Sequence, residues 1–151
     1  MTRANARELA LHLIYSRGFT GEAPQEAVDT RLGEEYYSTL AQEYRLYAED
    51  AASQRTYIRR VVAGVAENQE ALDARIAALS IGWDVKRISR VTRACLQLAM
   101  YEVLCEDTVP TNVAISEAVR LAKLYDGEDA AAFVNGILGS FARSLTIQGA
   151  E

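Results

Sequence analysis

The sequence predicts an all-α fold with about six or seven helices, on three observations. Apolar residues recur at helical spacing through most of the 151-residue chain. No segment keeps the strict alternation of apolar and polar residues that a half-buried strand requires. Proline occurs only at Pro24 and Pro110, so long helices can form without interruption. We expect two small helical subdomains, residues 1–80 and 81–146, followed by a tail at 147–151.

The first predicted helix runs from Ala4 to Arg17. Its core-facing side chains, which gather on one face at about 100° per residue, are Ala6, Leu9, Ala10, Leu13 and Ile14. A second set follows at intervals of four residues along the edge of that face: Arg3, Arg7, Leu11 and Tyr15. From Phe19 to Asp29, glycine and proline predict a loop that can hold a short helix.

The segment 19–52, within the first subdomain, is strongly acidic. It holds eight acidic and two basic residues, a net charge of −6, whereas the rest of the chain has a net charge of +1. The total of −5 therefore reflects one segment and does not exclude a nucleic-acid partner for the remainder. Within the segment, tyrosine and leucine at helical spacing predict an amphipathic helix over 34–52.

A long amphipathic helix is predicted from Ser53 to Leu79. Its apolar residues lie within about 60° of one direction: Ile58, Val61, Val62, Val65, Leu72, Ile76 and Leu79. Tyr57, Arg60 and Gly64 lie together beside that face. The sequence Ser80-Ile81-Gly82 is expected to end the helix.

The helix predicted at 89–105 is apolar nearly all round, which is typical of a helix at the centre of a fold. Glu102 projects in line with Cys95 and Leu98, and a buried carboxylate is costly unless it is paired or hydrogen-bonded. We expect Glu102 to accept hydrogen bonds from an arginine or a helix N-terminus. Nearby cations are expected to pair in part with Glu102 and other carboxylates: Lys86, Arg87, Arg90 and Arg93.

Two more helices follow. Pro110 suits the first turn of one that Asp126-Gly127 ends. The next contains AAAFVNGILG, residues 130–139, in which Asn-Gly favours a hairpin turn but the apolar residues fit a single helical arc. We therefore predict a helix in which Gly136 allows another helix to approach and the amide of Asn135 hydrogen-bonds a neighbouring backbone.

Composition disfavours several functional classes. No apolar run is long enough to span a membrane, and the N-terminus has no apolar stretch typical of a secretory signal, so we expect a cytoplasmic protein. Cys95 and Cys105, about 15 Å apart if they share a helix, are predicted to be two buried thiols rather than a disulfide. With one histidine and no paired catalytic or metal-ligating cluster, we expect no enzyme activity, metal or cofactor.

Several sequence blocks together resemble the NusB family. They are Ala6-Arg7-Glu8-Leu9-Ala10 with Tyr15, Ala63-Gly64-Val65, Leu98-Ala99-Met100-Tyr101-Glu102, Val109 to Val119 with Leu121-Ala122-Lys123, and Phe133-Val134-Asn135-Gly136-Ile137-Leu138. They stand in the family's order and span nearly the whole chain. The resemblance implies a helical bundle of two subdomains that is not an enzyme.

The resemblance also implies a function and partners. NusB proteins bind boxA, a short single-stranded RNA element, together with the ribosomal protein NusE, and support antitermination by RNA polymerase in ribosomal RNA operons. Relatives often carry a dense arginine run near the N-terminus, which is reduced here to Arg3. They also usually have asparagine where Ser116 stands, an acid where Thr92 stands and an arginine where Gln97 stands.

The residues that the resemblance places on the RNA face are Arg3, Arg7, Tyr15, Tyr57, Tyr125, Asp129 and Phe133. Aromatic rings can stack on unpaired bases, basic groups can meet phosphate, and a carboxylate can accept from a base edge. Structural roles stay open at the same positions. Asp129 can cap a helix and Phe133 can pack in the core, while Arg3 and Arg7 can be solvated.

Three alternatives remain open at this point. The chain can be a helical protein-interaction module with weakened RNA binding, which the thinned arginine run favours. It can be the accessory domain of a ribosomal-RNA methyltransferase, which would require a methyltransferase domain that we do not expect. A homodimer formed through the RNA-facing surface is also open, because some NusB relatives self-associate in that way.

Overall fold

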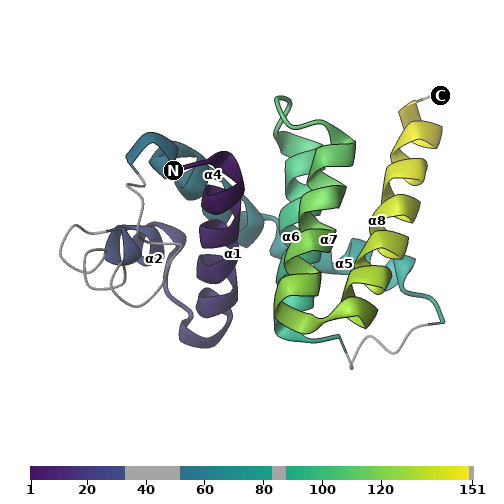
Figure 1. Cartoon of the computed structure of the whole chain (residues 1–151), viewed down its shortest axis with the longest axis horizontal. Coiled ribbons are helices and arrows are strands. Elements are labelled where there is room, and N and C mark those ends of the chain that lie inside the picture. Colours follow the sequence, from purple (N-terminus) through teal and green to yellow (C-terminus); the bar gives the residue numbers. More distant parts are fainter. Residues whose placement is uncertain (33–51, 83–87, 150–151) are drawn as a thin grey trace. The chain divides into compact units, whose positions relative to one another are not determined.

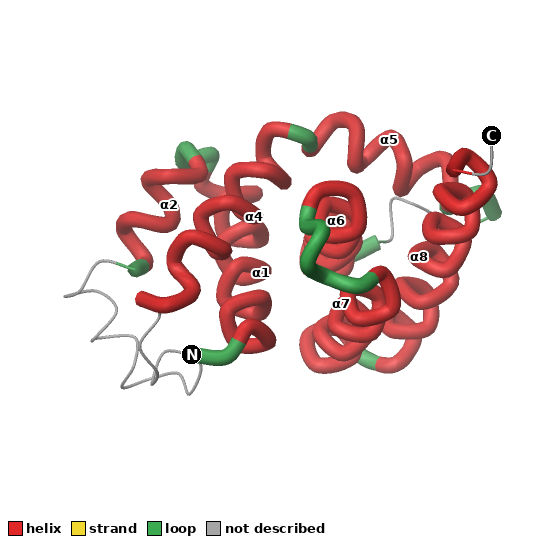
Figure 2. Tube along the Cα trace, turned by 90° about the horizontal axis from the view of Figure 1, so that it is seen from above, coloured by secondary structure: helices red, strands yellow, loops and turns green. Residues whose placement is uncertain are grey.

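The chain folds into α-helices, and the computed structural model describes residues 1–32, 52–82 and 88–149. By packing, it forms two compact units, Met1–Glu67 and Asn68–Glu151, called unit 1 and unit 2 below. No strand occurs in the described ranges, which confirms the all-α prediction (Figures 1 and 2). The predicted tyrosine-rich helix at 34–52 lies almost wholly outside the described residues, as do Lys86 and Arg87.

Unit 1 contains α1 (Arg3–Thr20), α2 (Pro24–Arg31), the short 3₁₀ helix η2 (Ala52–Gln54) and α4 (Arg55–Glu67). Both α1 and α2 pack against α4, whose buried face includes Ile58, Val61, Val62 and Val65. Helix α1 continues beyond the predicted end at Arg17, until Gly21 caps it with a φ of 70°. Such a left-handed residue after the last turn is the common helix terminator. The chain then re-enters a helix at Pro24, where the fixed φ of proline suits a first turn.

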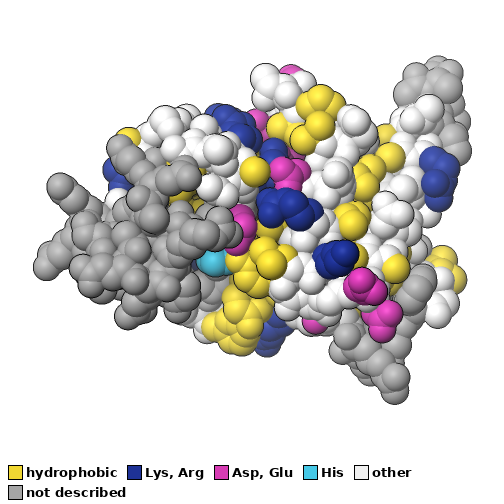
Figure 3. Space-filling model, in the orientation of Figure 1, with side chains coloured by type: hydrophobic (Ala, Val, Ile, Leu, Met, Phe, Trp, Pro, Cys, Tyr) yellow, Lys and Arg dark blue, Asp and Glu magenta, His cyan; other side chains and the backbone are white. Residues whose placement is uncertain are grey.

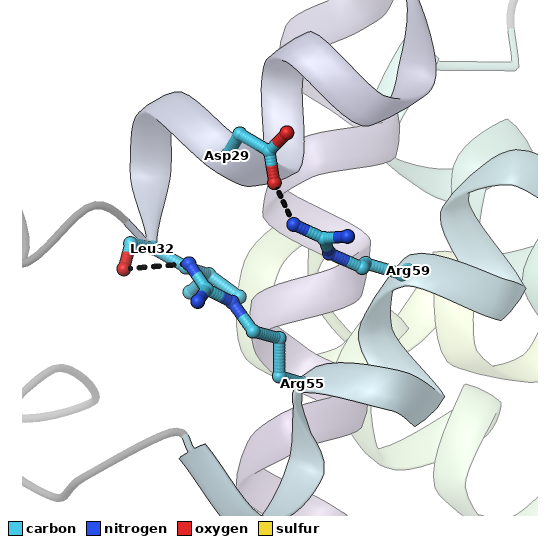
Figure 4. A network of polar contacts seen from close by, with 4 residues as sticks. All are labelled: Asp29, Leu32, Arg55 and Arg59. Carbon is cyan, nitrogen blue, oxygen red and sulfur yellow. Dashed lines mark hydrogen bonds and ion pairs between the residues drawn. The ribbon is translucent and has the colours of Figure 1, made fainter.

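Two arginines of α4 hold the end of α2 (Figure 4). Arg59 forms an ion pair with Asp29, and the Arg55 guanidinium donates to the carbonyl oxygen of Leu32 at 3.1 Å. Leu32 follows the last turn of α2, where backbone carbonyls lack helical partners and favour a positive charge. These contacts connect the acidic α2 to α4 through charge as well as apolar packing.

Unit 2 contains α5 (Gln69–Leu79), α6 (Arg90–Cys105), α7 (Thr111–Asp126) and α8 (Glu128–Gly149). Helix α6 packs against all three others, and α7 also packs against α8 (Figure 1). Continuous burial from Ala94 to Glu102 confirms that this helix is central to its unit. Glu102 is buried as expected, and the acceptor role predicted for its carboxylate stays a prediction.

The single long helix predicted from Ser53 to Leu79 is wrong, because the chain turns at Asn68 between α4 and α5. The apolar residues on the two sides of the turn serve different cores. Those of α4 pack within unit 1, whereas Leu72 and Ile76 of α5 are buried where α5 packs on α6 and α8. The compact units therefore divide earlier in the chain than the boundary after residue 80 that we predicted.

The AAAFVNGILG segment is helical, as predicted, and forms the first half of α8. Val134, Ile137, Leu138 and Phe141 are buried on one arc. Gly136 is exposed, and a Cβ atom built on it would meet nothing within 4 Å, so the predicted close approach of another helix is wrong. The side chain of Asn135 is likewise exposed, so packing does not offset the cost of Asn-Gly inside this helix.

The predicted buried pair of thiols is half right. Cys95 is buried in α6 and Cys105 is exposed at its end, and both are free thiols. Among the described helices, none combines the length and hydropathy needed to cross a membrane.

Replacing Gly136 by alanine is expected to stabilise the protein by about 1 kcal/mol, because the substitution improves helix propensity without a steric cost. Gly127→Ala provides the contrast. Gly127 has a φ of 95° between α7 and α8, so a side chain there is expected to cost about 1–3 kcal/mol. Urea denaturation measures both changes, and a Gly136→Ala variant less stable than the parent would contradict the open surface at this position.

Candidate nucleic-acid interface

The N-terminus of α1 carries a fixed arginine. The hydroxyl of Thr2 caps the helix by accepting from the backbone N–H of Asn5 at 3.1 Å, which places Arg3 in the first turn. A positive charge is unfavourable there, because the helix macrodipole favours anions at its N-terminus, and no acidic residue stands in that turn. Other contacts must therefore hold the guanidinium of Arg3.

Those contacts come from η2 and α4. The guanidinium carbon of Arg3 lies 4.0 Å from the centroid of the Tyr57 ring, and that of Arg7 lies 6.0 Å from the same centroid. The Nε atom of Arg3 donates to Oε1 of Gln54 at 2.7 Å. Arg3 is exposed, whereas Arg7 is only 4% exposed and Tyr57 only 2%.

This arrangement corrects two of the predicted roles. The Tyr57 ring is buried and carries a guanidinium over its face, so it is not available to stack directly on a base. Arg7 is buried rather than solvated and is likewise not presented at the surface for a phosphate. On α1, Arg3 is the one of the two predicted arginines that solvent reaches.

The C-terminal end of α1 presents two aromatic rings. Tyr15 is 40% exposed and Phe19 is 60% exposed. Their centroids lie 5.1 Å apart with an interplanar angle of 70°, an edge-to-face pair. The sequence prediction missed Phe19 because it ended the helix at Arg17. The signal was present, since Phe19 continues the four-residue ladder of Arg3, Arg7, Leu11 and Tyr15.

In unit 2, the corner between α7 and α8 holds the other predicted residues. Tyr125 and Asp129 are exposed there. Asp129 lies inside the first turn of α8, after Glu128, so it does not occupy the capping position before the helix. Phe133 is buried, as is its sequence neighbour Val134, and it belongs to the core arc of α8. Its burial favours a structural role over direct RNA contact.

A hydroxyl–carboxylate network fixes the end of α7. Oδ2 of Asp126 accepts from the Ser89 hydroxyl at 2.7 Å and from the Thr92 hydroxyl at 2.6 Å. The Ser89 hydroxyl in turn caps α6 by accepting from the backbone N–H of Thr92. The start of α6 is thereby tied to the residue that follows Tyr125, so the backbone at Tyr125 is held in place.

The cations near α6 only partly follow the prediction. Arg93 lies 3.6 Å from a carboxylate oxygen of Asp73 on α5, which confirms pairing with a carboxylate other than Glu102. The same oxygen accepts from the amide of Gln97 at 2.8 Å. Figure 3 shows Lys and Arg side chains among apolar and acidic side chains on the visible face.

No group of three or more His, Cys, Asp or Glu side chains in the described ranges could hold a metal ion. Burial, followed by the charge of Asp126, raises the pKa of the Cys95 thiol to about 12. Since the thiolate is the reactive form, Cys95 is an inert core residue.

Maleimide at pH 8 is therefore expected to modify Cys105 quickly and Cys95 only after unfolding, as counted by mass spectrometry. A Cys105→Ser control should show no fast labelling, and equal labelling rates at both thiols in the parent would contradict the assignment.

The raised pKa of Cys95 also predicts a pH dependence of stability. Above pH 9.0, the Cys95 thiol loses its proton in the unfolded chain but keeps it in the folded protein. The free energy of unfolding is therefore expected to fall as pH rises from 9 toward 12.

Comparison with known proteins identifies what this chain resembles. The model of the NusB family matches residues 4–143. A protein named transcription antitermination protein NusB from Acetivibrio thermocellus is 42% identical over 139 residues, 92% of this chain and 87% of that protein. Another of the same name, from Symbiobacterium thermophilum, is 40% identical over 96% of this chain and 92% of its own length.

A solved structure agrees with the sequence matches. T. maritima NusB superposes with a TM-score of 0.70 at 28% sequence identity, covering 95% of this chain and 92% of its own. The likeness therefore covers both helical units and is not confined to one sequence block.

Proposed function

This chain belongs to the NusB family, and on that premise we propose that it is a transcription antitermination factor that binds boxA RNA together with NusE. The observation that carries the proposal is the match to proteins of that name over nearly the whole chain. The protein would act in the RNA polymerase antitermination complex as a binding component rather than an enzyme. A role on nascent transcripts would place it in the cytoplasm.

Each unit offers groups suited to single-stranded RNA. In unit 1, Tyr15 and Phe19 present ring surface on which unpaired bases can stack, and Arg3 presents a guanidinium to phosphate. In unit 2, Tyr125 offers another ring and Asp129 a carboxylate that can accept from a base amino group. Arg7 and Phe133 are buried and would not contact RNA directly.

A second candidate is a protein-interaction module whose RNA binding is weak. The observation that favours it is the burial of Arg7, Tyr57 and Phe133, which leaves one exposed arginine among the predicted RNA-binding residues. Binding to NusE without measurable binding to boxA RNA would support this candidate over the first.

An electrophoretic titration of boxA RNA, with and without NusE and at several salt concentrations, tests the proposal. Binding is expected to need the boxA sequence, to tighten with NusE and to weaken as salt rises, because phosphate contacts release counterions. If neither boxA RNA nor NusE binds at low salt, the proposal is wrong.

Alanine variants test the aromatic pair. Tyr15→Ala and Phe19→Ala are each expected to cost about 1–3 kcal/mol of RNA-binding free energy, since each removes a surface for base stacking. Leu104→Ala is the matched control, because Leu104 on α6 is an apolar residue that is 40% exposed, as Tyr15 is. Unchanged RNA affinity in both variants would remove the Tyr15–Phe19 pair from the interface, while NusE binding shows that each variant is folded.

A further inference from the structure

Within unit 1, the contacts of Arg3 give Tyr57 a role different from base stacking. We propose that Tyr57 is a positioning residue: its buried ring holds the guanidinium of Arg3 at the start of α1, ready for an RNA phosphate. The inference rests on the proposed RNA-binding function. In this proposal Arg3 contacts the phosphate and Tyr57 contacts Arg3, so the ring of Tyr57 acts without touching RNA.

The geometry supports this division of roles. A guanidinium carbon 4.0 Å from the ring centroid is in the range of a stacked cation–π contact, which the negative face of the ring favours. Since the Tyr57 ring is 2% exposed, water competes little for that face. The hydrogen bond from Nε to Gln54 fixes the rotation of the guanidinium plane about the ring. Two independent contacts therefore determine where the side chain of Arg3 lies.

The same contacts leave the binding end of Arg3 available. Arginine has five N–H donors, and the hydrogen bond to Gln54 uses only the one on Nε. The two terminal amino groups, whose fork geometry matches the oxygens of a phosphate, make no hydrogen bond within the described residues. Arg3 is exposed, so a phosphate in solution can reach these donors.

Pre-organisation also explains how a single exposed arginine can contribute to RNA binding. A mobile arginine loses about 2 kcal/mol of side-chain entropy when it is fixed on a ligand, whereas a side chain that is already fixed loses less. Arg7, whose guanidinium carbon lies 6.0 Å from the same ring, is a second guanidinium near Tyr57 but is buried, so Arg3 is the one that a phosphate can reach.

The test compares Tyr57→Phe, which keeps the ring, with Tyr57→Leu, which removes it. With boxA RNA, Tyr57→Phe is expected to bind within about twofold of the parent, whereas Tyr57→Leu is expected to bind roughly fivefold more weakly. The slope of log affinity against log salt is also expected to fall in Tyr57→Leu by up to about 0.7, the contribution of one phosphate contact on a single strand. In an Arg3→Ala background, Tyr57→Leu should have little further effect.

Additive effects of Arg3→Ala and Tyr57→Leu on RNA affinity would overturn the proposal, and so would parent-like binding by Tyr57→Leu. Because Tyr57 is buried, Tyr57→Leu can unfold unit 1. Gln54→Leu is therefore the second variant, since it releases Nε of Arg3 from a half-buried position outside the core. It is expected to weaken binding in the same direction, and parent-like affinity and salt slope would count against positioning.

A measurement without RNA separates this proposal from the proposed function. In the free protein, side-chain protons of Arg3 are expected to show a ring-current shift that is kept in Tyr57→Phe and lost in Tyr57→Leu, measured by NMR. If the shift behaves in this way and boxA RNA does not bind, the stack exists and the RNA function is wrong. If RNA binds and the shift is absent from the parent, the positioning role is wrong.

Discussion

The packing of α1 against α4 is the interaction on which unit 1 depends. Both helices present faces of fully buried residues, including Leu9 on α1 and Val61 on α4. Once these faces meet, the first turn of α1 lies over Tyr57, and the surface of unit 1 follows from that placement. The core and the candidate RNA-binding groups are thus parts of one arrangement, because Tyr57 belongs to the buried set of α4 and also contacts Arg3.

In unit 2, polar contacts between helices hold the candidate RNA-binding residues in place. Ser89, which caps the central helix α6, and Thr92 in its first turn both donate to Asp126 at the end of α7. Here the carboxylate comes from α7 and the hydroxyl from α6, so a polar connection joins the two helices without a charge on α6 at that position. The corner that presents Tyr125 and Asp129 is therefore fixed by backbone and side-chain geometry together, with Gly127 supplying the required φ.

The sequence predicted which segments are helical better than it predicted which helices pack against one another. Periodicity is a local signal, and it was sufficient to assign AAAFVNGILG to a helix against the Asn-Gly turn signal. It could not place the break at Asn68, because one continuous apolar stripe fits both a single helix and two helices that face different cores. Burial on each side of Asn68 depends on which helices pack there, and that information is not local.

The same limit explains the candidate site. Tyr57 lies at the edge of an apolar face, where spacing alone cannot decide between a ring that meets solvent and one that is covered. The structure decides it through Arg3 and Gln54, of which Arg3 is more than 50 residues away in sequence. Phe19 was within reach of sequence reasoning, because the ladder of α1 continues to it, but glycine at position 18 predicted an earlier helix end than the one observed.

A negative chain that binds RNA must obtain its affinity from few, well-placed groups. Segment 19–52 carries a charge of −6 and the rest of the chain only +1, so long-range electrostatic attraction of a polyanion contributes little. Base stacking on Tyr15 and Phe19 depends much less on charge and tolerates this background. Most of the binding energy of such an interface would come from stacking on unpaired bases, so the small number of rings would limit its affinity. A partner that adds RNA contacts from a second surface then raises affinity through effective concentration, without new contacts on this chain. The small number of exposed rings and basic groups on this chain therefore favours the proposed dependence of RNA affinity on a partner such as NusE.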